Sequence, residues 1–378
     1  MLHSAPRPLR VNGQPTGLIF VTQLLDPADP VLGFVAGLLP ALATRCDRLF
    51  VIANELRAVP EGIDAEYESL GKERGRSRLA RTLQYESLLM RLRRGRSFRG
   101  LFAHMCPVYA TLSAPLLRPS GLRVVLWYAH PADSWELAIA EHLSSVVLTS
   151  LPGAYPRRTA KAVAVGQAID TDRWRLATPP EPGPTLRLVA LGRTSPVKGY
   201  PVLIKAVKRA HERGLRVHLR LLAPTTTPQE VRHRKELTSL VDMLGLGDAV
   251  DMLDGVPPSA VPAIVADSDV VVNATRVGSG DKAVFEAMAS GRLVVVSNSA
   301  FAQLLDNLPA ELVFPDGDVE ALVDRLEAIA ALTAPERETV GRQLRDRVVH
   351  GHSVSSWAEA VVGAVTGTLV PPSAEPAP

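Results

Sequence analysis

The sequence contains little cysteine and little excess charge. Cys46 and Cys106 are the two cysteines in 378 residues. So few thiols exclude a disulfide framework and a multi-cysteine zinc site, and they fit a reducing compartment. The formal net charge is only +3, which is small for this length and does not indicate a nucleic-acid binder. We therefore expect a cytoplasmic protein with no nucleic-acid partner.

Long apolar runs and dinucleotide fingerprints are also missing. The longest apolar run, Val31 to Ala43, is interrupted by two glycines and a proline and is shorter than a membrane span. We expect a helix packed on a sheet there. Residues 1–17 have no apolar core of the signal-peptide kind. Neither half has G-x-G-x-x-G after its first predicted strand, which argues against a nicotinamide or flavin dehydrogenase.

The remaining composition is that of a globular protein, with 46% hydrophobic and 21% charged residues. A chain of this length favours two domains. Short apolar runs alternate with helical stretches, which is typical of parallel α/β sheets. The predicted strands are 18–25, 48–54, 100–105, 122–129, 144–150 and 161–166, then 186–192, 217–223, 249–254, 268–273, 292–298 and 311–314. The proline-rich segment 171–185 between the two sets predicts an interdomain linker.

The stretch "GSGDKAVFEAMASG" (278–291) places a glutamate among apolar residues. It predicts a helix that starts near Asp281 and ends at Gly291. Because this helix follows a strand, its free N–H groups and dipole would suit a phosphate, and Gly278 and Gly280 would let the backbone approach a ligand. Glu286, about one turn into the helix, would accept hydrogen bonds from two adjacent hydroxyls, such as a ribose diol. A surface glutamate on an amphipathic helix is the alternative, which the pattern alone leaves open.

A second loop, "GRTSPVKG" (192–199), follows the first predicted strand of the second domain. Arg193 and Lys198 are close enough in this loop to converge on one anion, which Arg binds bidentately and Lys as a point charge. Two solvated cations are the ordinary alternative. Taken together, the basic loop, the helix N-terminus and Glu286 predict a nucleoside-diphosphate site.

These segments resemble a known family. "LVALGRTSPVKGYPVLIKAV" and "SDVVVNATRVGSGDKAVFEAMASGRLVVVSN" look like the donor-binding half of retaining GT-B glycosyltransferases of the glycogen synthase and mannosyltransferase type, often called family 4. "VGQAIDTDRW" is similar to the family's strand-to-linker segment, with Asp170 at its aspartate, and "HSVSSWAEAV" resembles its closing helix. The resemblance implies an α/β GT-B fold of two Rossmann-like, doubly wound domains that face a central cleft.

The expected domain boundaries follow from this resemblance and from the predicted linker. They are an N-terminal Rossmann-like acceptor domain at 1–170, the linker at 171–185, a nucleotide-sugar donor domain at 186–350, a helix at 351–368 that crosses back to the first domain, and a disordered tail at 369–378.

The resemblance also implies roles for individual residues. Arg193 and Lys198 would bind the donor diphosphate, Glu286 the nucleotide ribose, and His130 would lie beside the donor sugar. His130, Arg193 and Lys198 are thus the expected catalytic residues. The other expected donor contacts are Gly33, in the phosphate loop of the first domain, Asp254, Gly255 and Val256 along the base, and Gly278, Ser279, Gly280, Asp281 and Lys282 at the helix N-terminus.

One position departs from the family pattern. Gly278 stands where the family has a glutamate that contacts the transferred sugar, which leaves the identity of the donor open. Asp281 would reach the sugar in its place or cap the helix. Lys282 would add positive charge near the phosphates or remain solvated.

We therefore expect a retaining glycosyltransferase that moves a sugar from a UDP- or GDP-sugar to a small-molecule acceptor. No D-x-D-like carboxylate pair stands at a predicted strand end, so we expect no metal and no cofactor besides the nucleotide-sugar co-substrate. The basic stretch 72–99 has ten Lys/Arg against two Glu. It leaves open a lipid-linked or polysaccharide acceptor at a membrane surface. A GT-B epimerase or phosphorylase and a catalytically silent nucleotide-sugar binder are further alternatives, and the sequence does not indicate the oligomeric state.

Overall fold

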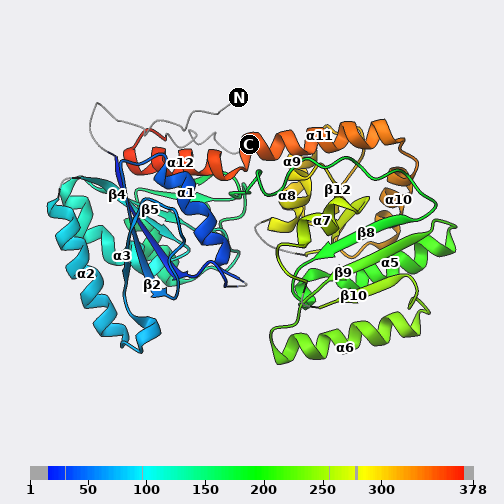
Figure 1. Ribbon diagram of the computed structural model, residues 1–378, viewed down its shortest axis with the longest axis horizontal. Coiled ribbons are helices and arrows are strands. Elements are labelled where there is room, and N and C mark those ends of the chain that lie inside the picture. The colour runs from blue at the N-terminus through cyan, green and yellow to red at the C-terminus, as the bar shows by residue number, and fades with distance from the viewer. Residues whose placement is uncertain (1–15, 30, 96, 255, 277–279, 370–378) are drawn as a thin grey trace. The chain divides into compact units, whose positions relative to one another are not determined.

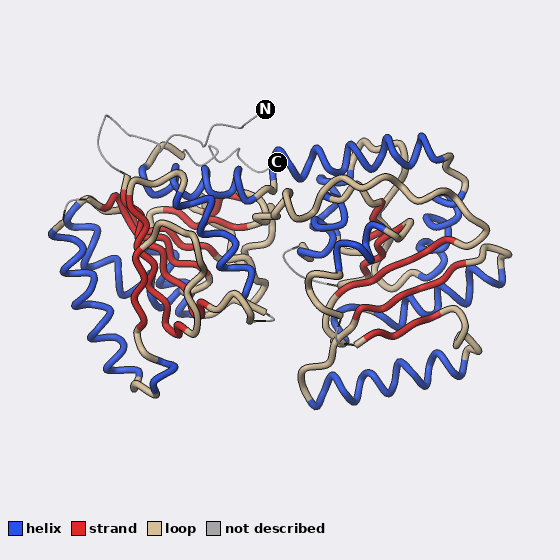
Figure 2. The backbone as a smooth tube through the Cα atoms, viewed as in Figure 1, coloured by secondary structure: helices blue, strands red, loops and turns tan. Residues whose placement is uncertain are grey.

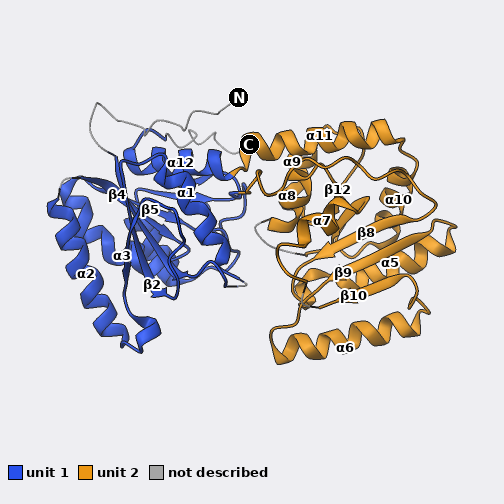
Figure 3. Ribbon diagram, in the orientation of Figure 1, with its two compact units in different colours: residues 1–168, 354–378 blue, residues 169–353 orange. Residues whose placement is uncertain are grey.

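The computed structural model describes residues 16–369 except 30, 96, 255 and 277–279. The chain divides into two compact units (Figure 3). Unit 1 holds the residues up to Ala168 together with those from Val354 onward, and unit 2 is Ile169–Ser353. Both units consist of a parallel sheet with helices on its faces (Figure 2), which confirms the predicted α/β fold with two Rossmann-like domains.

Unit 1 contains a seven-stranded sheet of order β3-β2-β1-β4-β5-β6-β7, in which every pair is parallel. Its strands are β1 (Gly17–Leu25), β2 (Arg48–Leu56), β3 (Glu66–Ser69), β4 (Phe98–His104), β5 (Arg123–Trp127), β6 (Val146–Thr149) and β7 (Ala162–Ala164). Its helices are η1 (Gly33–Leu38), α1 (Leu39–Ala43), η2 (Lys72–Arg74), α2 (Arg78–Arg94), α3 (Pro107–Leu117), η3 (Arg118–Ser120), α4 (Trp135–Leu143) and α12 (Val354–Thr366).

Both faces of this sheet are buried, so its central strands are nearly continuous apolar runs. Phe20 and Val51 face one core with α1 and α12, whereas Ile19 and Ile52 face another core with α2, α3 and α4 (Figure 1). Trp357 of α12 is fully buried in the first core. Its ring meets the rings of Phe102 and Trp127 edge-on at 5.5 Å and 5.9 Å. Helix α12 therefore completes the core of unit 1.

Unit 2 contains a five-stranded parallel sheet of order β10-β9-β8-β11-β12. Its strands are β8 (Leu186–Leu191), β9 (Val217–Leu222), β10 (Val250–Leu253), β11 (Val270–Asn273) and β12 (Leu293–Val296). Its helices are η4 (Pro196–Lys198), α5 (Tyr200–Glu212), α6 (Pro228–Met243), α7 (Val261–Ala266), α8 (Lys282–Ala289), η5 (Ser299–Phe301), α9 (Ala302–Leu305), α10 (Val319–Ala330) and α11 (Ala334–Gly351). Helix α5 packs on β9, and α8 packs on β11 and β12.

Successive strands are added to one side of the sheet and then to the other. This change of side falls between β1 and β4 in unit 1 and between β8 and β11 in unit 2. Open α/β sheets bind ligands at this switch point, outside the carboxyl ends of the strands. Both features described below, the candidate site of unit 2 and a cavity of unit 1, lie at these points.

Three expectations differ from the structure. The predicted strand 311–314 is only an isolated bridge between Val313 and Val296. Strand β3 was not predicted because its polar sequence, EYES, covers a half-exposed edge. The segment 171–185, expected as a linker between the two domains, lies within unit 2, where Arg292 donates to the carbonyls of Ala177 and Thr178, both at 2.7 Å. The expected tail lies, except for Leu369, outside the described residues.

Candidate functional site

Two glycines shape the loop that follows β8. Gly192 has φ +138°, and a Cβ on it would come within 2.7 Å of the end of the Lys198 side chain. Gly199 has φ +65°, and a Cβ there would lie 2.3 Å from the carbonyl oxygen of Ala274. Both positions therefore require glycine, the first so that Lys198 can fold across the loop and the second so that two loops can touch.

The two loops singled out from the sequence lie side by side in unit 2. Strand β8 pairs with β11, so the loops that follow these strands leave the same edge of the sheet. Besides the close approach of Gly199 to Ala274, the N–H of Arg276 donates to the carbonyl of Val197 at 3.2 Å. The switch point of unit 2 thus brings together residues about eighty positions apart in the sequence.

Lys198 and Asp281 form the central contact between these loops. The Lys198 ammonium donates to Oδ2 of Asp281. This oxygen also accepts from Asn273 Nδ2 at 2.9 Å and Thr275 Oγ1 at 3.3 Å. Asp281 is the N-cap of α8, since its side chain accepts from the N–H of Ala283. Asp281 therefore both caps the helix and holds Lys198 beside the helix N-terminus.

Helix α8 ends as predicted. Gly291 has φ +70°, and the N–H of Arg292 donates to the carbonyl of Ala287 at 3.0 Å, which is the Schellman pattern of helix termination. The helix thus presents its N-terminus at the loops and carries Glu286 one turn further in.

Glu286 is not a solvated surface glutamate. Its side chain is 21% exposed and lies 3.9 Å from the Lys282 ammonium. Burial raises the pKa of Glu286 to about 7, and the positive charges of Lys282 and Arg173 and a hydrogen bond from Trp174 oppose this rise. Burial also lowers the pKa of Lys282, which pairs with Glu286 and is only 33% exposed. The site thus contains a sheltered carboxyl that titrates near neutral pH.

The raised pKa of Glu286 predicts a pH-dependent effect on stability. The folded protein keeps a proton that the unfolded chain releases above its ordinary pKa of 4.5, so the free energy of unfolding falls as the pH rises from 4.5 to 7. The variant Glu286→Gln has no carboxyl group to ionise at this position, so its free energy of unfolding does not fall for this reason. We expect the variant to exceed the wild type by about 1–3 kcal/mol at about pH 8, with little difference at about pH 4.

Urea denaturation of both proteins at the two pH values measures this difference. Glu338→Gln is the matched control, because Glu338 is 47% exposed and pairs with Arg342 within one helix. An equal gain from Glu286→Gln at both pH values would show that ionisation of the carboxyl is not its cause.

Arg193, from the same loop as Lys198, pairs with a carboxylate of α6. Its guanidinium lies 3.1 Å from Oε1 of Glu230, and its side chain is 56% exposed. Glu230 is buried and forms a capping box at the start of α6 with Thr227. The sequence T-P-Q-E signals this cap but does not show that Glu230 holds Arg193. Glu230 is therefore a site residue that the sequence analysis missed.

The structure describes only part of the predicted base-binding and sugar-binding segments. Asp254 follows β10, and its carboxylate pairs with Arg234 at 3.0 Å, while Val256 is half-buried. Gly280 is buried with φ +65°. The predicted contacts Gly255, Gly278 and Ser279 lie outside the described residues.

The two predicted site residues of the first domain lie in unit 1. His130 follows β5 and is exposed, and its Nδ1 accepts from the N–H of Ala132 at 3.1 Å. Gly33 begins the short helix η1, where a Cβ would lie 2.8 Å from the carbonyl oxygen of Pro27. Close backbone packing is therefore sufficient to explain this glycine.

The described part of the chain lacks membrane-spanning helices and metal-binding clusters. Within residues 16–369, leaving aside the six that are not described, no helix has the length and apolar character to span a membrane. In the same part of the chain, no three His, Cys, Asp or Glu side chains are grouped so that they would hold a metal ion. The basic stretch 72–99 forms η2, α2 and the start of β4, and Leu79 and Leu83 of α2 are 69% and 58% exposed.

Comparison with known proteins gives consistent results. Residues 185–331 match the family model described as "Glycosyl transferases group 1". The chain is 29% identical, over 48% of its length and 45% of the relative, to Escherichia coli K12 WcaL, whose name assigns it as a colanic acid biosynthesis glycosyltransferase. It is 30% identical, over 44% of its length and 39% of the relative, to D-inositol 3-phosphate glycosyltransferase of Corynebacterium glutamicum. The chain thus matches less than half the length of these curated relatives.

Solved structures resemble most of the chain. A glycosyltransferase from Rickettsia africae has a TM-score of 0.72 at 10% identity, covering 93% of this chain and 98% of its own. Anabaena HepE in complex with UDP and glucose has a TM-score of 0.69 at 15% identity, covering 93% and 100%. At such identities the likeness shows the fold alone. The chain therefore has the two-domain GT-B fold of these glycosyltransferases, and the part of unit 2 that carries Arg193, Lys198 and Glu286 matches the group 1 glycosyl transferases.

Proposed function

We propose that the protein is a retaining glycosyltransferase that moves a sugar from a UDP- or GDP-sugar to an acceptor. The observation that carries the proposal is the contact between Lys198 and Asp281. It joins the basic loop after β8 to the N-terminus of α8, the helix that carries the sheltered carboxyl of Glu286. Two cations, a helix N-terminus and a carboxyl in adjoining loops suit a nucleoside diphosphate.

In this proposal Lys198 and Arg193 stabilise the diphosphate leaving group. Lys198 has three N–H donors and uses one with Asp281, so two remain for phosphate oxygens. Asp281 is then a positioning residue, because it fixes the ammonium beside the N-terminus of α8. Charge on the diphosphate grows as the glycosidic bond breaks, so these cations stabilise the transition state more than the bound donor.

Glu286 would bind the ribose of the nucleotide. A carboxylate accepts hydrogen bonds from two adjacent hydroxyls, and Trp174 and Lys282 already orient this carboxyl. Complexes of HepE with UDP and with UDP-glucose support a nucleotide sugar as the donor. His130, at the end of β5, would hydrogen-bond the donor sugar from unit 1.

For the acceptor we propose a small molecule, which the name of the D-inositol 3-phosphate glycosyltransferase supports. The alternative is a polysaccharide or lipid-linked acceptor, and the assignment of WcaL to colanic acid biosynthesis supports it. Assays with soluble alcohols and with polysaccharide acceptors separate these two possibilities.

Calorimetry with a panel of nucleoside diphosphates tests the proposal. We expect Glu286→Ala to weaken UDP or GDP binding about 10–100-fold, because a charged acceptor is lost. The same substitution should weaken the 2′-deoxy nucleotide less, because that ligand lacks one of the two hydroxyls. Glu181→Ala, at an exposed position of unit 2, is the control.

Two results would contradict the proposal: no nucleoside diphosphate binds, or binding is unchanged by both Arg193→Ala and Glu286→Ala. Nucleotide binding without any sugar transfer or donor hydrolysis would instead favour a catalytically silent binder.

A further inference from the structure

Unit 1 contains a cavity of about 410 Å³ that the donor site does not use. We call it the basic pocket, and it is lined by Gln23, Asn54, Lys72, Arg78, Arg81, Thr82, Val108, Tyr109 and Leu112. These residues come from the carboxyl-terminal parts of β1 and β2, from η2, and from the N-terminal parts of α2 and α3. The pocket therefore lies at the switch point of the first sheet, where open α/β sheets bind ligands.

The lining residues carry positive charge that is only partly neutralised. None of the nine lining residues is an acid. Within the described part of the chain, neither Arg78 nor Arg81 has a carboxylate within ion-pair distance. Lys72 lies 2.9 Å from Glu55, but this carboxylate is shared with Arg57. The pocket thus holds an excess of cations that would favour an anionic ligand.

A buried polar network fixes the position of Arg81. Asn54 is 5% exposed, and its Oδ1 accepts from a terminal nitrogen of Arg81 and, at 2.8 Å, from the hydroxyl of Tyr109. Its Nδ2 donates to Gln23 at 3.3 Å. Nε of Arg81 is buried without a partner among the described residues. Its second terminal nitrogen has no hydrogen bond to the described residues. Arg81 is therefore held in place with this donor still available, and a guanidinium suits a phosphate or carboxylate.

Two helix N-termini add to the positive electrostatic potential of the basic pocket. Arg78 and Arg81 lie in the first turns of α2, a helix of 17 residues, and Val108 and Tyr109 in the first turn of α3, a helix of 11 residues. The positive ends of both helix dipoles thus lie at the pocket. Val108, which is 49% exposed, and Leu112 supply an apolar wall for the uncharged part of a ligand.

We propose that the basic pocket binds a phosphate or carboxylate group of the acceptor, so that the acceptor is an anionic molecule. That the bound anion is the acceptor rests on the proposed function, whereas the anion site itself rests on the pocket. A soluble sugar phosphate and the phosphate of a lipid both present this chemistry.

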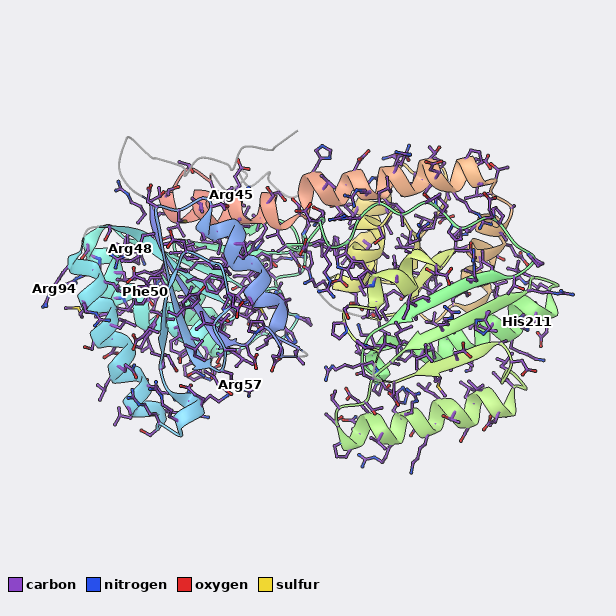
Figure 4. The ribbon with its side chains drawn as sticks, in the orientation of Figure 1. Arg45, Arg48, Phe50, Arg57, Arg94 and His211 are labelled. Carbon is purple, nitrogen blue, oxygen red and sulfur yellow. The ribbon has the colours of Figure 1, made fainter. Side chains whose placement is uncertain are left out.

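Binding of inorganic phosphate, followed by ³¹P line broadening, tests the anion site. The full chain carries Lys198→Ala, so that the candidate site of unit 2 contributes little. We expect Arg78→Gln/Arg81→Gln to weaken phosphate binding at least about tenfold, since two charged donors are lost. Arg94→Gln is the matched control, because Arg94 is exposed at the opposite end of α2 (Figure 4). Equal binding by the double variant and the control would overturn the proposal.

Folding of the double variant is checked by circular dichroism, and Arg81→Lys provides a second test. Lysine keeps the charge but loses the planar guanidinium. We therefore expect the phosphate affinity of Arg81→Lys to lie between that of the wild type and that of the double variant. Arg81→Lys binding no better than the folded double variant would contradict a contribution from charge at this position.

Two further ligands distinguish the sources of the anion. Glucose 6-phosphate, compared with glucose, represents a soluble acceptor. Vesicles of phosphatidylcholine with phosphatidic acid, compared with phosphatidylcholine alone, represent a lipid acceptor. Binding of either anionic probe that is lost in the double variant and kept in Arg94→Gln supports the proposal for that source. If the double variant still bound both anionic probes as well as Arg94→Gln does, the proposal would be overturned.

Nucleoside diphosphate binding is measured in parallel on the chain that keeps Lys198. Phosphate binding in unit 1 without any nucleoside diphosphate binding in the unsubstituted chain would refute the proposed function and leave the anion site standing. Nucleoside diphosphate binding with no anion binding in unit 1 would refute the site alone.

Discussion

Replacing Lys198 with alanine is expected to lower kcat/KM for sugar transfer by about 10²–10³-fold, which corresponds to about 2.7–4 kcal/mol of transition-state stabilisation. The size of this effect follows from the position of the ammonium. Lys198 is 18% exposed and is held by Asp281 at the N-terminus of α8. A sheltered charge of this kind interacts more strongly with a phosphate than a solvated one.

Steady-state kinetics with the nucleotide sugar selected by calorimetry provide the measurement. Lys205→Ala is the control, because Lys205 lies on the exposed face of α5, shortly after the same loop. We expect its kcat/KM to match that of the wild type. If Lys198→Ala changed kcat/KM no more than Lys205→Ala does, Lys198 would have no part in leaving-group stabilisation.

Replacing Trp357 with alanine is expected to lower the free energy of unfolding of unit 1 by about 3–5 kcal/mol. Trp357 is the largest fully buried side chain of the protein's described part, and it packs on Phe102 and Trp127. Its removal leaves a cavity that the flanking strands β4 and β5 fill only in part. Because the two units need not unfold together, hydrogen exchange of the amides in the first sheet is the suitable measurement.

Trp135→Ala is the matched control for this substitution. The same residue type is lost there, also from a helix of unit 1, but Trp135 is 71% exposed. We expect a change within about 0.5 kcal/mol. Trp357→Phe should cost less than Trp357→Ala, because it keeps an aromatic ring and removes an indole N–H that is buried without a partner among the described residues. Comparable losses from Trp357→Ala and Trp135→Ala would argue against α12 as a part of the core.

The sheets could be predicted largely from the sequence because their strands are buried on both faces. A run such as Val270–Asn273 can be recognised as a strand without knowing its neighbours in the sheet. Each predicted strand other than 311–314 overlaps an observed one. Edge strands are harder, since β3 has a solvated face and a polar sequence. The opposite error occurs at 311–314, where an apolar run predicted a strand and the structure has only an isolated bridge at Val313.

The candidate site was predictable in its parts but not in its contacts. Glycine and strand signals located the loop of Lys198 and the helix of Glu286. That Asp281 would hold Lys198 depends on the pairing of β8 with β11, and that Glu230 would hold Arg193 depends on the position of α6. Neither contact is local, so no sequence window contains it. The network around Asn54 in the basic pocket has the same origin, since its members come from four separate elements.

The position of α12 has a consequence for synthesis. The chain enters unit 2 at Ile169 and leaves it at Ser353, and these two residues form a β-bridge. A ribosome therefore synthesises all of unit 2 before it reaches Trp357. One apolar face of the first sheet, although made earliest, is covered only in part, by η1 and α1, until α12 has been made. We expect nascent chains that stop before α12 to need chaperones, while the segment made second is already folded.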